Sequence, residues 1–135
     1  MQRETKVYIF TLFLIIMTTA SLHAKLTPKD DIPKDMPAVV KTQVERFYAT
    51  DNNERIAAAK QLKELGDEAL TAVPYLIMML DDENMIVRRE IVYTLRALKA
   101  VSALKPLKEV MENDPVDAVK RAARMAIDAI NEAEK

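Results

Sequence analysis

One helical phrase recurs three times at nearly regular intervals, and this repetition constrains the fold more than any other feature. Its copies are Asp51–Leu65, Asp81–Leu98 and Asn113–Ile130. Aligning them by their apolar ends makes Leu62, Leu95 and Ile127 equivalent. The regular spacing of these copies lies in the range typical of solenoids built from stacked helix pairs. The sequence therefore predicts an all-α fold, an α-solenoid of three helix pairs.

Periodicity and composition both favour helix over sheet. In the central copy, Val87, Ile91 and Leu95 recur at the helical spacing, which places them on one buried stripe. The chain has one glycine, 5% aromatic residues and a net charge of −1, so neither a strand-rich fold nor a general polyanion binder is indicated. The absence of cysteine excludes disulfides and thiolate metal sites.

The segment 1–24 has the pattern of a secretory signal peptide. Arg3 and Lys6 form a short basic region, Val7–Met17 is a continuous apolar run, and Thr18–Ala24 supplies small and polar residues. An uncleaved N-terminal anchor is the alternative, although the apolar run is shorter than the roughly 20 residues of a membrane span. We therefore expect an exported protein, periplasmic or secreted, that contacts the membrane only if this segment is retained.

The rest of the chain divides into a linker and a repeat domain. Residues 25–35 are polar and contain proline, which predicts an extended linker. Residues 36–135 are expected to form the repeat domain, with helix pairs over about 36–66, 68–99 and 102–133. Gly66 suits a helix C-terminus. Pro74 should either kink the first helix of its pair or mark the true start of that helix.

The recurring phrases resemble HEAT repeats of the short bacterial type, also called PBS-lyase-type repeats. In that family an apolar first helix is followed by an Asp-containing turn, then Val-Arg and a second helix with small residues facing inward. Val-Arg at 87–88 and Val-Lys at 119–120 match this pattern, and Ala58 and Ala123 occupy the small position. Ile91 departs from it, because it is larger than the usual alanine. The resemblance implies the solenoid fold, but such repeats serve many functions.

Residues suited to catalysis or metal binding are scarce. The single histidine, His23, lies in the predicted signal peptide, so the mature chain would lack both histidine and cysteine. The acidic run at 81–83 could touch a divalent cation, but it lacks a glycine to bend the loop, and helix capping is the favoured interpretation. The methionines Met78, Met79, Met85, Met111 and Met125 are interpreted as core residues rather than copper ligands. We expect no enzyme activity, no metal and no cofactor.

Three basic residues stand at matched positions one turn into the second helices: Arg55, Arg88 and Lys120. The turns before these helices carry Asp51, Asp82 and Asp114. We expect a structural ladder in which each cation pairs with a turn aspartate of its own or a neighbouring repeat. The alternative is that these cations contact a ligand.

A candidate partner-binding surface follows from the same alignment. The second helices of such a stack are expected to line its concave side, where solenoids bind their partners. The residues of this mostly basic strip are Lys60, Lys63, Arg89, Tyr93, Arg96, Arg121 and Met125, flanked by Arg124. Arginine and tyrosine are enriched where interfaces carry their binding energy. The alternative is an ordinary solvated face with i, i+4 pairs such as Lys60–Glu64 and Arg124–Asp128.

These features predict an exported, non-catalytic scaffold that binds another protein of the cell envelope through this strip. Two alternatives remain open. One is an accessory factor for an enzyme or pigment–protein assembly, which the resemblance to lyase-type repeats implies and which requires a small-molecule pocket. The other is a structural repeat that self-associates through its end helices. A nucleic-acid partner is not expected, because Asp128 interrupts the basic strip and an exported protein seldom meets DNA.

Overall fold

The structure, a computed structural model, describes residues 29–135. The predicted signal peptide and the start of the predicted linker lie outside these residues. Two compact units are distinguished along the chain, Met1–Asp31 and Ile32–Lys135. Of the first unit, the described residues form one short 3-10 turn, η1 (Lys29–Asp31). The fold described below is that of the second unit.

Helices follow one another through this unit, and no strand occurs among the described residues. The α-helices are α2 (Ala38–Arg46), α3 (Asn52–Leu65), α4 (Val73–Met78), α5 (Met85–Ala97), α6 (Leu104–Asn113) and α7 (Asp117–Ala133). Short 3-10 segments connect some of them: η2 (Gly66–Ala72), η3 (Met79–Asp81) and η4 (Val101–Ala103). The all-α fold predicted from the repeat is confirmed.

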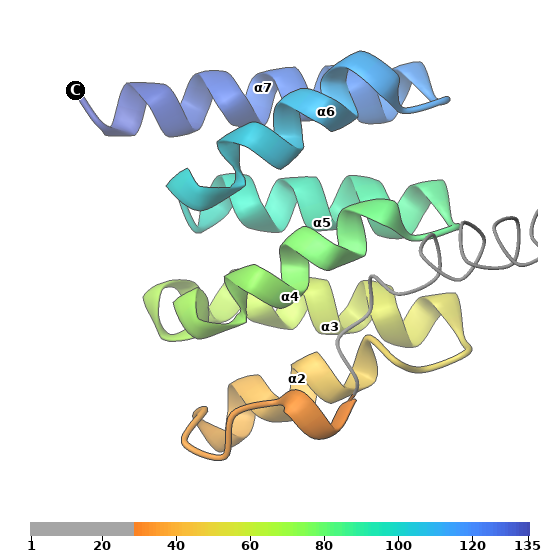
Figure 1. Cartoon of the computed structure of the whole chain (residues 1–135), viewed down its shortest axis with the longest axis vertical. Helices are drawn as coiled ribbons and strands as arrows, with labels where there is room; N and C mark the ends of the chain where they lie inside the picture. Colours follow the sequence, from red (N-terminus) through yellow and green to blue (C-terminus); the bar gives the residue numbers. More distant parts are fainter. Residues whose placement is uncertain (1–28) are drawn as a thin grey trace, which may run out of the picture. The chain divides into compact units, whose positions relative to one another are not determined.

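The helices lie in two layers. One layer contains α2, α4 and α6 and the other contains α3, α5 and α7, with each first helix packed on its own second helix (Figure 1). Within the second layer, α5 packs against α3 on one side and against α7 on the other. The stack of helix pairs is the α-solenoid that the regular spacing of the repeated phrase predicts.

Side chains in the turns determine where two of the second helices begin. The Asp51 carboxylate accepts a hydrogen bond from the Asn53 backbone N–H at 2.9 Å, which caps α3. At α5 the side-chain oxygen of Asn84 accepts from the N–H groups of Ile86 at 2.8 Å and Val87 at 3.3 Å. Asp51 and Asn84 hold equivalent positions in successive repeats.

The first helix of the second pair starts later than predicted. Residues 66–72 form η2, and α4 begins only at Val73. Pro74 lies in the first turn of α4. A proline at this point lacks the N–H group and clashes with the carbonyl four residues earlier, so the α-helix cannot extend backwards. Pro106 stands in the same way in the first turn of α6, after η4. Of the two expectations for Pro74, the helix start is the one observed.

The described part of the predicted linker is not an extended tether. Lys29–Asp31 form a 3-10 turn, and Ile32 and Met36 are buried in the hydrophobic core. The packed unit therefore begins at Ile32, ahead of the predicted start at Met36. Ile32 stands alone between charged residues and Pro33, so no helical or strand periodicity signalled its burial.

One continuous hydrophobic core runs between and along the two layers. Its largest fully buried side chains include Leu62, Leu76, Ile91, Leu95, Leu107 and Ile130. The inward position that carries Ala58 in α3 and Ala123 in α7 carries Ile91 in α5, and all three have 0% exposure. The larger residue is therefore accommodated at this position in the central repeat, whose second helix has a neighbour on both sides.

A buried hydroxyl links two of the second helices. Thr94 of α5 is fully buried, and its Oγ1 lies 3.0 Å from the carbonyl oxygen of Ala59 in α3. The same hydroxyl lies 3.0 Å from the carbonyl oxygen of Glu90, one turn earlier in α5. The polar group is thus satisfied inside the core, which removes the cost of burying it.

Gly66 and Lys99 hold equivalent positions at the C-terminal ends of α3 and α5. Both have positive φ, 55° at Gly66 and 50° at Lys99. After α5, the Lys99 N–H donates to the Arg96 carbonyl at 3.1 Å and the Ala100 N–H to the Leu95 carbonyl at 3.1 Å. This is the Schellman motif, in which glycine is the usual residue at the position of Lys99. Lysine is strained there by its Cβ atom.

Exchanging glycine at these positions should change stability in opposite directions. Lys99→Gly should raise the free energy of unfolding by about 0.5–1 kcal/mol, because relief of the strain exceeds the entropy gained by the unfolded chain. Gly66→Ala should lower it by about 1–3 kcal/mol, although no heavy atom lies within 4 Å of an added Cβ. Urea denaturation measures both effects. A less stable Lys99→Gly variant would contradict the strain.

Candidate protein-binding face

An arginine of α5 ties the second helix pair to the third. Arg88 Nε lies 2.7 Å from Asp114 Oδ2, and Arg88 Nη2 lies 3.0 Å from Asp114 Oδ1, so the ion pair is bidentate. Its Nη1 donates to the carbonyl oxygens of Asp82 at 2.8 Å and Glu83 at 3.2 Å. Only 9% of the Arg88 side chain and 4% of the Asp114 side chain are exposed. Arg88 therefore holds the turn before its own helix and the turn of the next repeat together.

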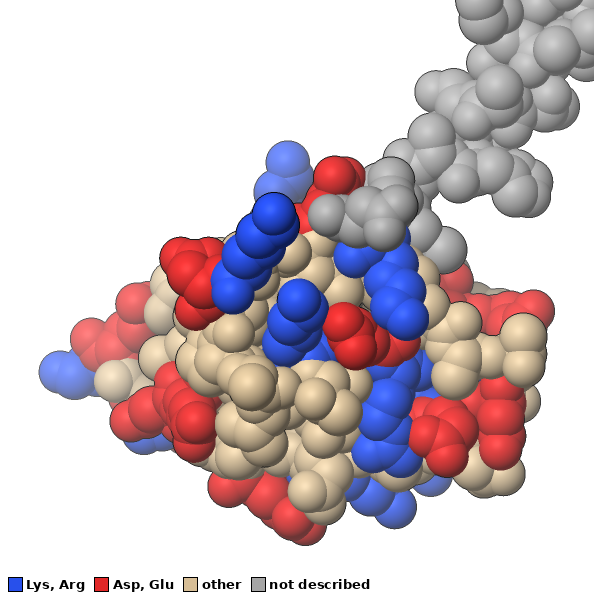
Figure 2. All heavy atoms as spheres, turned by 90° about the horizontal axis from the view of Figure 1, so that it is seen from below, with Lys and Arg blue, Asp and Glu red and all other residues tan. Residues whose placement is uncertain are grey.

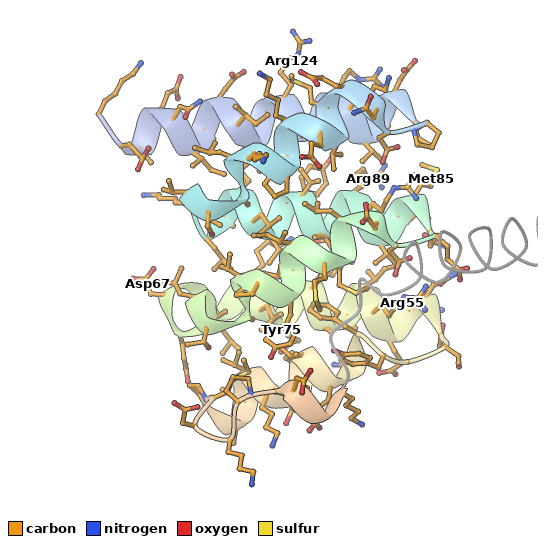
Figure 3. All side chains as sticks on the ribbon, in the orientation of Figure 1. Arg55, Asp67, Tyr75, Met85, Arg89 and Arg124 are labelled. Carbon is orange, nitrogen blue, oxygen red and sulfur yellow. The ribbon has the colours of Figure 1, made fainter. Side chains whose placement is uncertain are left out.

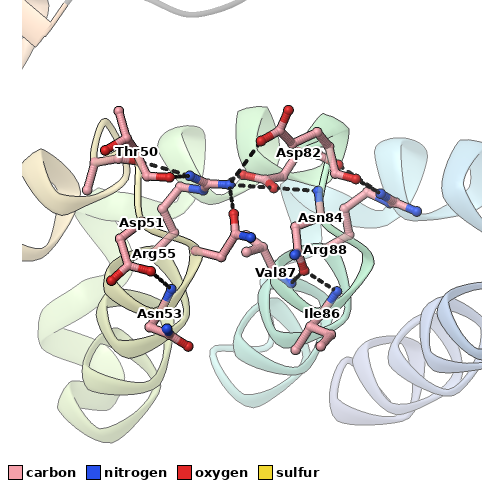
Figure 4. A network of polar contacts seen from close by, with 12 residues as sticks. Thr50, Asp51, Asn53, Arg55, Asp82, Asn84, Ile86, Val87 and Arg88 are labelled. Carbon is pink, nitrogen blue, oxygen red and sulfur yellow. Dashed lines mark hydrogen bonds and ion pairs between the residues drawn. The ribbon is translucent and has the colours of Figure 1, made fainter.

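The same arrangement occurs one repeat earlier (Figure 4). Arg55 Nη1 donates to the carbonyl oxygens of Ala49 at 2.8 Å and Thr50 at 3.2 Å. Its Nε and Nη2 lie 2.8 and 3.2 Å from the two carboxylate oxygens of Asp82 in the next turn. That carboxylate also accepts from the Asn84 N–H at 2.8 Å. In both cases the arginine reaches forward along the chain, from one repeat to the next.

Two residues predicted for the ladder lie outside it. Asp51 caps α3, and the position equivalent to Asp82 in the first repeat is Ala49. Because each arginine reaches forward, the first turn receives no arginine from an earlier repeat of the described unit. Lys120 belongs to the last helix pair described, and its Nζ donates to the carbonyl oxygen of Glu112 at 3.2 Å. The ladder therefore consists of two steps.

The step between Arg88 and Asp114 changes the pKa of both groups. The hydrogen bond to Asp114 raises the pKa of Arg88 above its ordinary value, although burial opposes this change. At Asp114, burial alone would raise the pKa. Hydrogen bonds from Arg88 and from the Val116 N–H outweigh burial, and they hold the pKa of this carboxyl below its ordinary value of 3.8.

Acid should weaken this step. Because the folded-state pKa of Asp114 lies below the ordinary 3.8 of the unfolded chain, the carboxylate stabilises the fold above that pH. This stabilisation is lost as the pH falls through the folded-state pKa. In urea denaturation at a series of acidic pH values, Asp114→Asn should therefore lose less additional stability than the wild type. Parallel losses in the two proteins would contradict a depressed pKa at Asp114.

The residues of the predicted strip come from three adjacent helices. We call their surface the second-helix face and define it by Lys60, Lys63, Arg89, Tyr93, Arg96, Arg121 and Met125, which belong to α3, α5 and α7. Lys60, Tyr93 and Met125 occupy equivalent positions and so form one row across these helices. Tyr93 is 36% exposed and Met125 53% exposed. The face thus presents large apolar side chains among cations.

One cation of the face is already paired. Lys63 Nζ lies 2.7 Å from Glu90 Oε1, which joins α3 to α5. Arg96 holds the position of Lys63 one repeat later, but Ala122 replaces Glu90 in α7. Among the described residues, no hydrogen bond or ion pair engages the Arg96 guanidinium. The missing acid leaves Arg96 available to a partner.

The i, i+4 ion pairs expected for an ordinary solvated face are not formed at the two places where the sequence suggested them. Within residues 29–135, neither Lys60 with Glu64 nor Arg124 with Asp128 forms an ion pair. Glu64 instead accepts a hydrogen bond from the Gln61 amide at 3.1 Å. These cations are therefore not neutralised along their own helices.

Arg124, which is predicted to flank the strip, is exposed at the end of the stack. Its equivalents are Ala59 in α3 and Val92 in α5, which are fully buried. No helix follows α7 in the described chain, so the same position is exposed there. Figure 3 shows the Arg124 side chain directed away from the other helices. An alignment of second helices cannot by itself distinguish this outer position from the face.

Both ends of the stack carry charge. Around the α2 end, side chains of both signs surround an uncharged area (Figure 2). The α7 end carries the exposed residue Arg124. Burying such charges against a second copy is costly unless each finds a matched partner. The ends therefore give little support to self-association through the end helices.

An open hollow of about 390 Å³ lies between α5 and α7. Its lining residues are Tyr93, Arg96, Ala97, Lys99 and Ala129. Lys99 is absent from the predicted strip, because it belongs to the loop after α5 and not to a second helix. Its equivalence to Gly66 was the available signal.

Two of the methionines predicted to lie in the core are exposed. Met79 is buried and Met78 and Met111 pack against the core, but Met85 and Met125 are exposed, so their interpretation as core residues is wrong. In the described part of the chain, no group of three or more His, Cys, Asp or Glu residues is placed to hold a metal. The helices of residues 29–135 include none that is long and apolar enough to span a membrane.

The stacked helix pairs, the two layers and the buried ladder between turns define the class, an α-solenoid repeat protein. Comparison with protein families matches residues 41–128, more than half of the 135-residue chain, to HEAT repeats. The chain therefore belongs to the HEAT repeat family, whose members generally mediate protein–protein interaction. A search of curated proteins found no match.

Proposed function

We propose that this protein is an exported, non-catalytic scaffold that binds another protein of the cell envelope through its second-helix face. The observation that carries this proposal is the coincidence of exposed apolar side chains with cations that have no partner. Tyr93 and Met125 are exposed on this face. Lys60, Arg89, Arg96 and Arg121 make no side-chain hydrogen bond or ion pair with other described residues.

This combination is favourable for binding a protein. Tyrosine and arginine are enriched among the residues that carry binding energy. An unpaired arginine gains charge-assisted hydrogen bonds when a partner carboxylate arrives, without first breaking an internal pair. The helices beneath are held by a continuous core and by the buried Arg88–Asp114 pair. Little ordering is then required on binding, which favours affinity.

Export and the absence of catalysis are supported by sequence chemistry. The order of basic, apolar and small residues in 1–24 is that of a signal peptide. His23, the single histidine, lies in the same segment, and the chain contains no cysteine. The usual general base near neutral pH and the thiol nucleophile are therefore missing from the rest of the chain.

Affinity capture from the native cell envelope tests the proposal. The tagged full chain should retain a specific protein, and Arg89→Glu with Arg96→Glu should abolish this retention while leaving helicity and melting temperature nearly unchanged. Both side chains lie on the face and outside the ladder, so their reversal should not disturb packing.

Lys105→Glu with Lys108→Glu is the matched control. These lysines belong to α6 in the first layer, and their reversal changes the net charge by the same amount. Loss of the captured protein in the control as well would show that overall charge, not the face, governs retention. Unfolding of the Arg89/Arg96 variant would show that the face is structural.

A further inference from the structure

The hollow between α5 and α7 on the second-helix face is lined by both cationic and apolar side chains. Arg96 and Lys99 place two cations on its lining. Ala97 and Ala129 give it apolar walls, and the ring of Tyr93 stands at its side. Because these alanines are small, the hollow stays open where larger side chains would fill it. These lining residues favour a ligand that is both anionic and apolar.

Its two cations are available for binding. Ala122 stands where an acid would pair with Arg96, as Glu90 pairs with Lys63. No hydrogen bond or ion pair within the described residues engages the side chain of Lys99 either. A carboxylate that enters the hollow can therefore pair with both cations without displacing a group of this chain.

The backbone of Lys99 is strained, because its φ is positive and it is not glycine. Gly66, its equivalent in the first repeat, takes positive φ without a Cβ atom. Lys99 has a Cβ atom and adopts φ 50°. Residues strained in this way are found more often at functional sites than elsewhere. The strain places an ammonium group beside Arg96, where glycine would leave none.

Exposed apolar side chains continue from the hollow along the same two helices. Of the large hydrophobic residues exposed in the described chain, more than half belong to α5 and α7: Met85, Ile86, Tyr93 and Met125. Ile86 and Tyr93 are two turns apart on one side of α5. A partner segment can therefore bury apolar side chains on this row while its carboxylates reach the hollow.

We propose that the second-helix face binds an acidic polypeptide segment that carries Asp or Glu beside a large apolar side chain, with the carboxylate held by Arg96 and Lys99. This inference rests on the proposed function and specifies the chemistry of the partner. Charge complementarity favours an acidic segment. The exposed apolar row disfavours a nucleic acid, which requires a continuous cationic surface.

Selection from a library of random short peptides tests the inference directly. The full chain should enrich peptides with excess Asp or Glu next to Leu, Phe, Ile or Trp, and fluorescence anisotropy then gives their Kd. Arg96→Glu should weaken binding by at least about tenfold. Lys99→Gly should weaken it by about threefold to tenfold while its melting temperature rises, which separates lost binding from lost folding. Lys108→Glu, on α6, should bind as the wild type does.

Several outcomes would overturn the inference. These are selected peptides without excess negative charge, equal binding to Arg96→Glu and wild type, or displacement of the peptides by single-stranded oligonucleotides or anionic vesicles at lower concentration than by acidic peptides. If envelope capture still depends on Arg89 and Arg96, only the acidic-segment inference fails. If capture also fails, the proposed function fails with it.

Discussion

Replacing Arg88 with alanine should lower the free energy of unfolding by about 3–5 kcal/mol. The change leaves the Asp114 carboxylate buried without its bidentate partner, since only 4% of that side chain is exposed. It also removes the donor to the turn carbonyls of Asp82 and Glu83. Urea denaturation followed by far-UV circular dichroism measures the loss.

The neighbouring arginine provides the control. Arg89→Ala removes a guanidinium outside the ladder and should change stability by no more than about 0.5 kcal/mol. In a double-mutant cycle, Arg88→Ala with Asp114→Ala should cost less than the sum of the single variants, because the second change removes the orphaned carboxylate. Simple additivity would show that the pair observed in the structure contributes no coupling.

Truncating Ile91 to alanine should cost about 2–5 kcal/mol. The side chain has 0% exposure and lies in the central helix, which packs on both neighbouring second helices. The variant would carry the residue found at the equivalent positions Ala58 and Ala123. It should nevertheless be destabilised, because the surroundings in α5 are packed around the larger side chain and collapse only in part.

Met125→Ala is the corresponding exposed truncation. Met125 is 53% exposed, so the variant should lose no more than about 0.5 kcal/mol. A small effect at Ile91 as well would mean that the central repeat adapts freely to alanine. In that case the core would be held by the flanking repeats.

The layer arrangement could be predicted from sequence because two independent regularities agree. The offsets between repeats fix which helices are equivalent, and the helical spacing of Val87, Ile91 and Leu95 fixes which side is buried. Ile32 could not be found in this way, because a single apolar residue has no period. The 3-10 start of the second pair depends on backbone clashes at Pro74, which permitted two outcomes.

The ladder was predictable in its residue types but not in its direction. Arg55, Arg88, Asp82 and Asp114 follow from recurrence, whereas the forward reach of each arginine depends on how the repeats stack. Asp51 was assigned to the ladder because it is the aspartate of the first turn. Its position is nevertheless equivalent to that of Asn84, and Ala49 is the residue equivalent to Asp82. Arg96 has no acidic partner in α7, because Ala122 replaces the residue equivalent to Glu90, which pairs with Lys63 one repeat earlier. No single-helix spacing rule reveals such a contact.

Because each arginine of the ladder pairs with an aspartate of the next repeat, the two borders of the central unit are complementary. The central unit carries both halves of the joint, Asp82 to receive the arginine before it and Arg88 to reach the aspartate after it. An inserted duplicate of this unit would therefore find a matching partner at both of its borders without any compensating substitution. The first repeat, with Ala49 at the receiving position, would leave the arginine before it unpaired. Gene duplication of the central unit should therefore cost less stability than duplication of the first repeat.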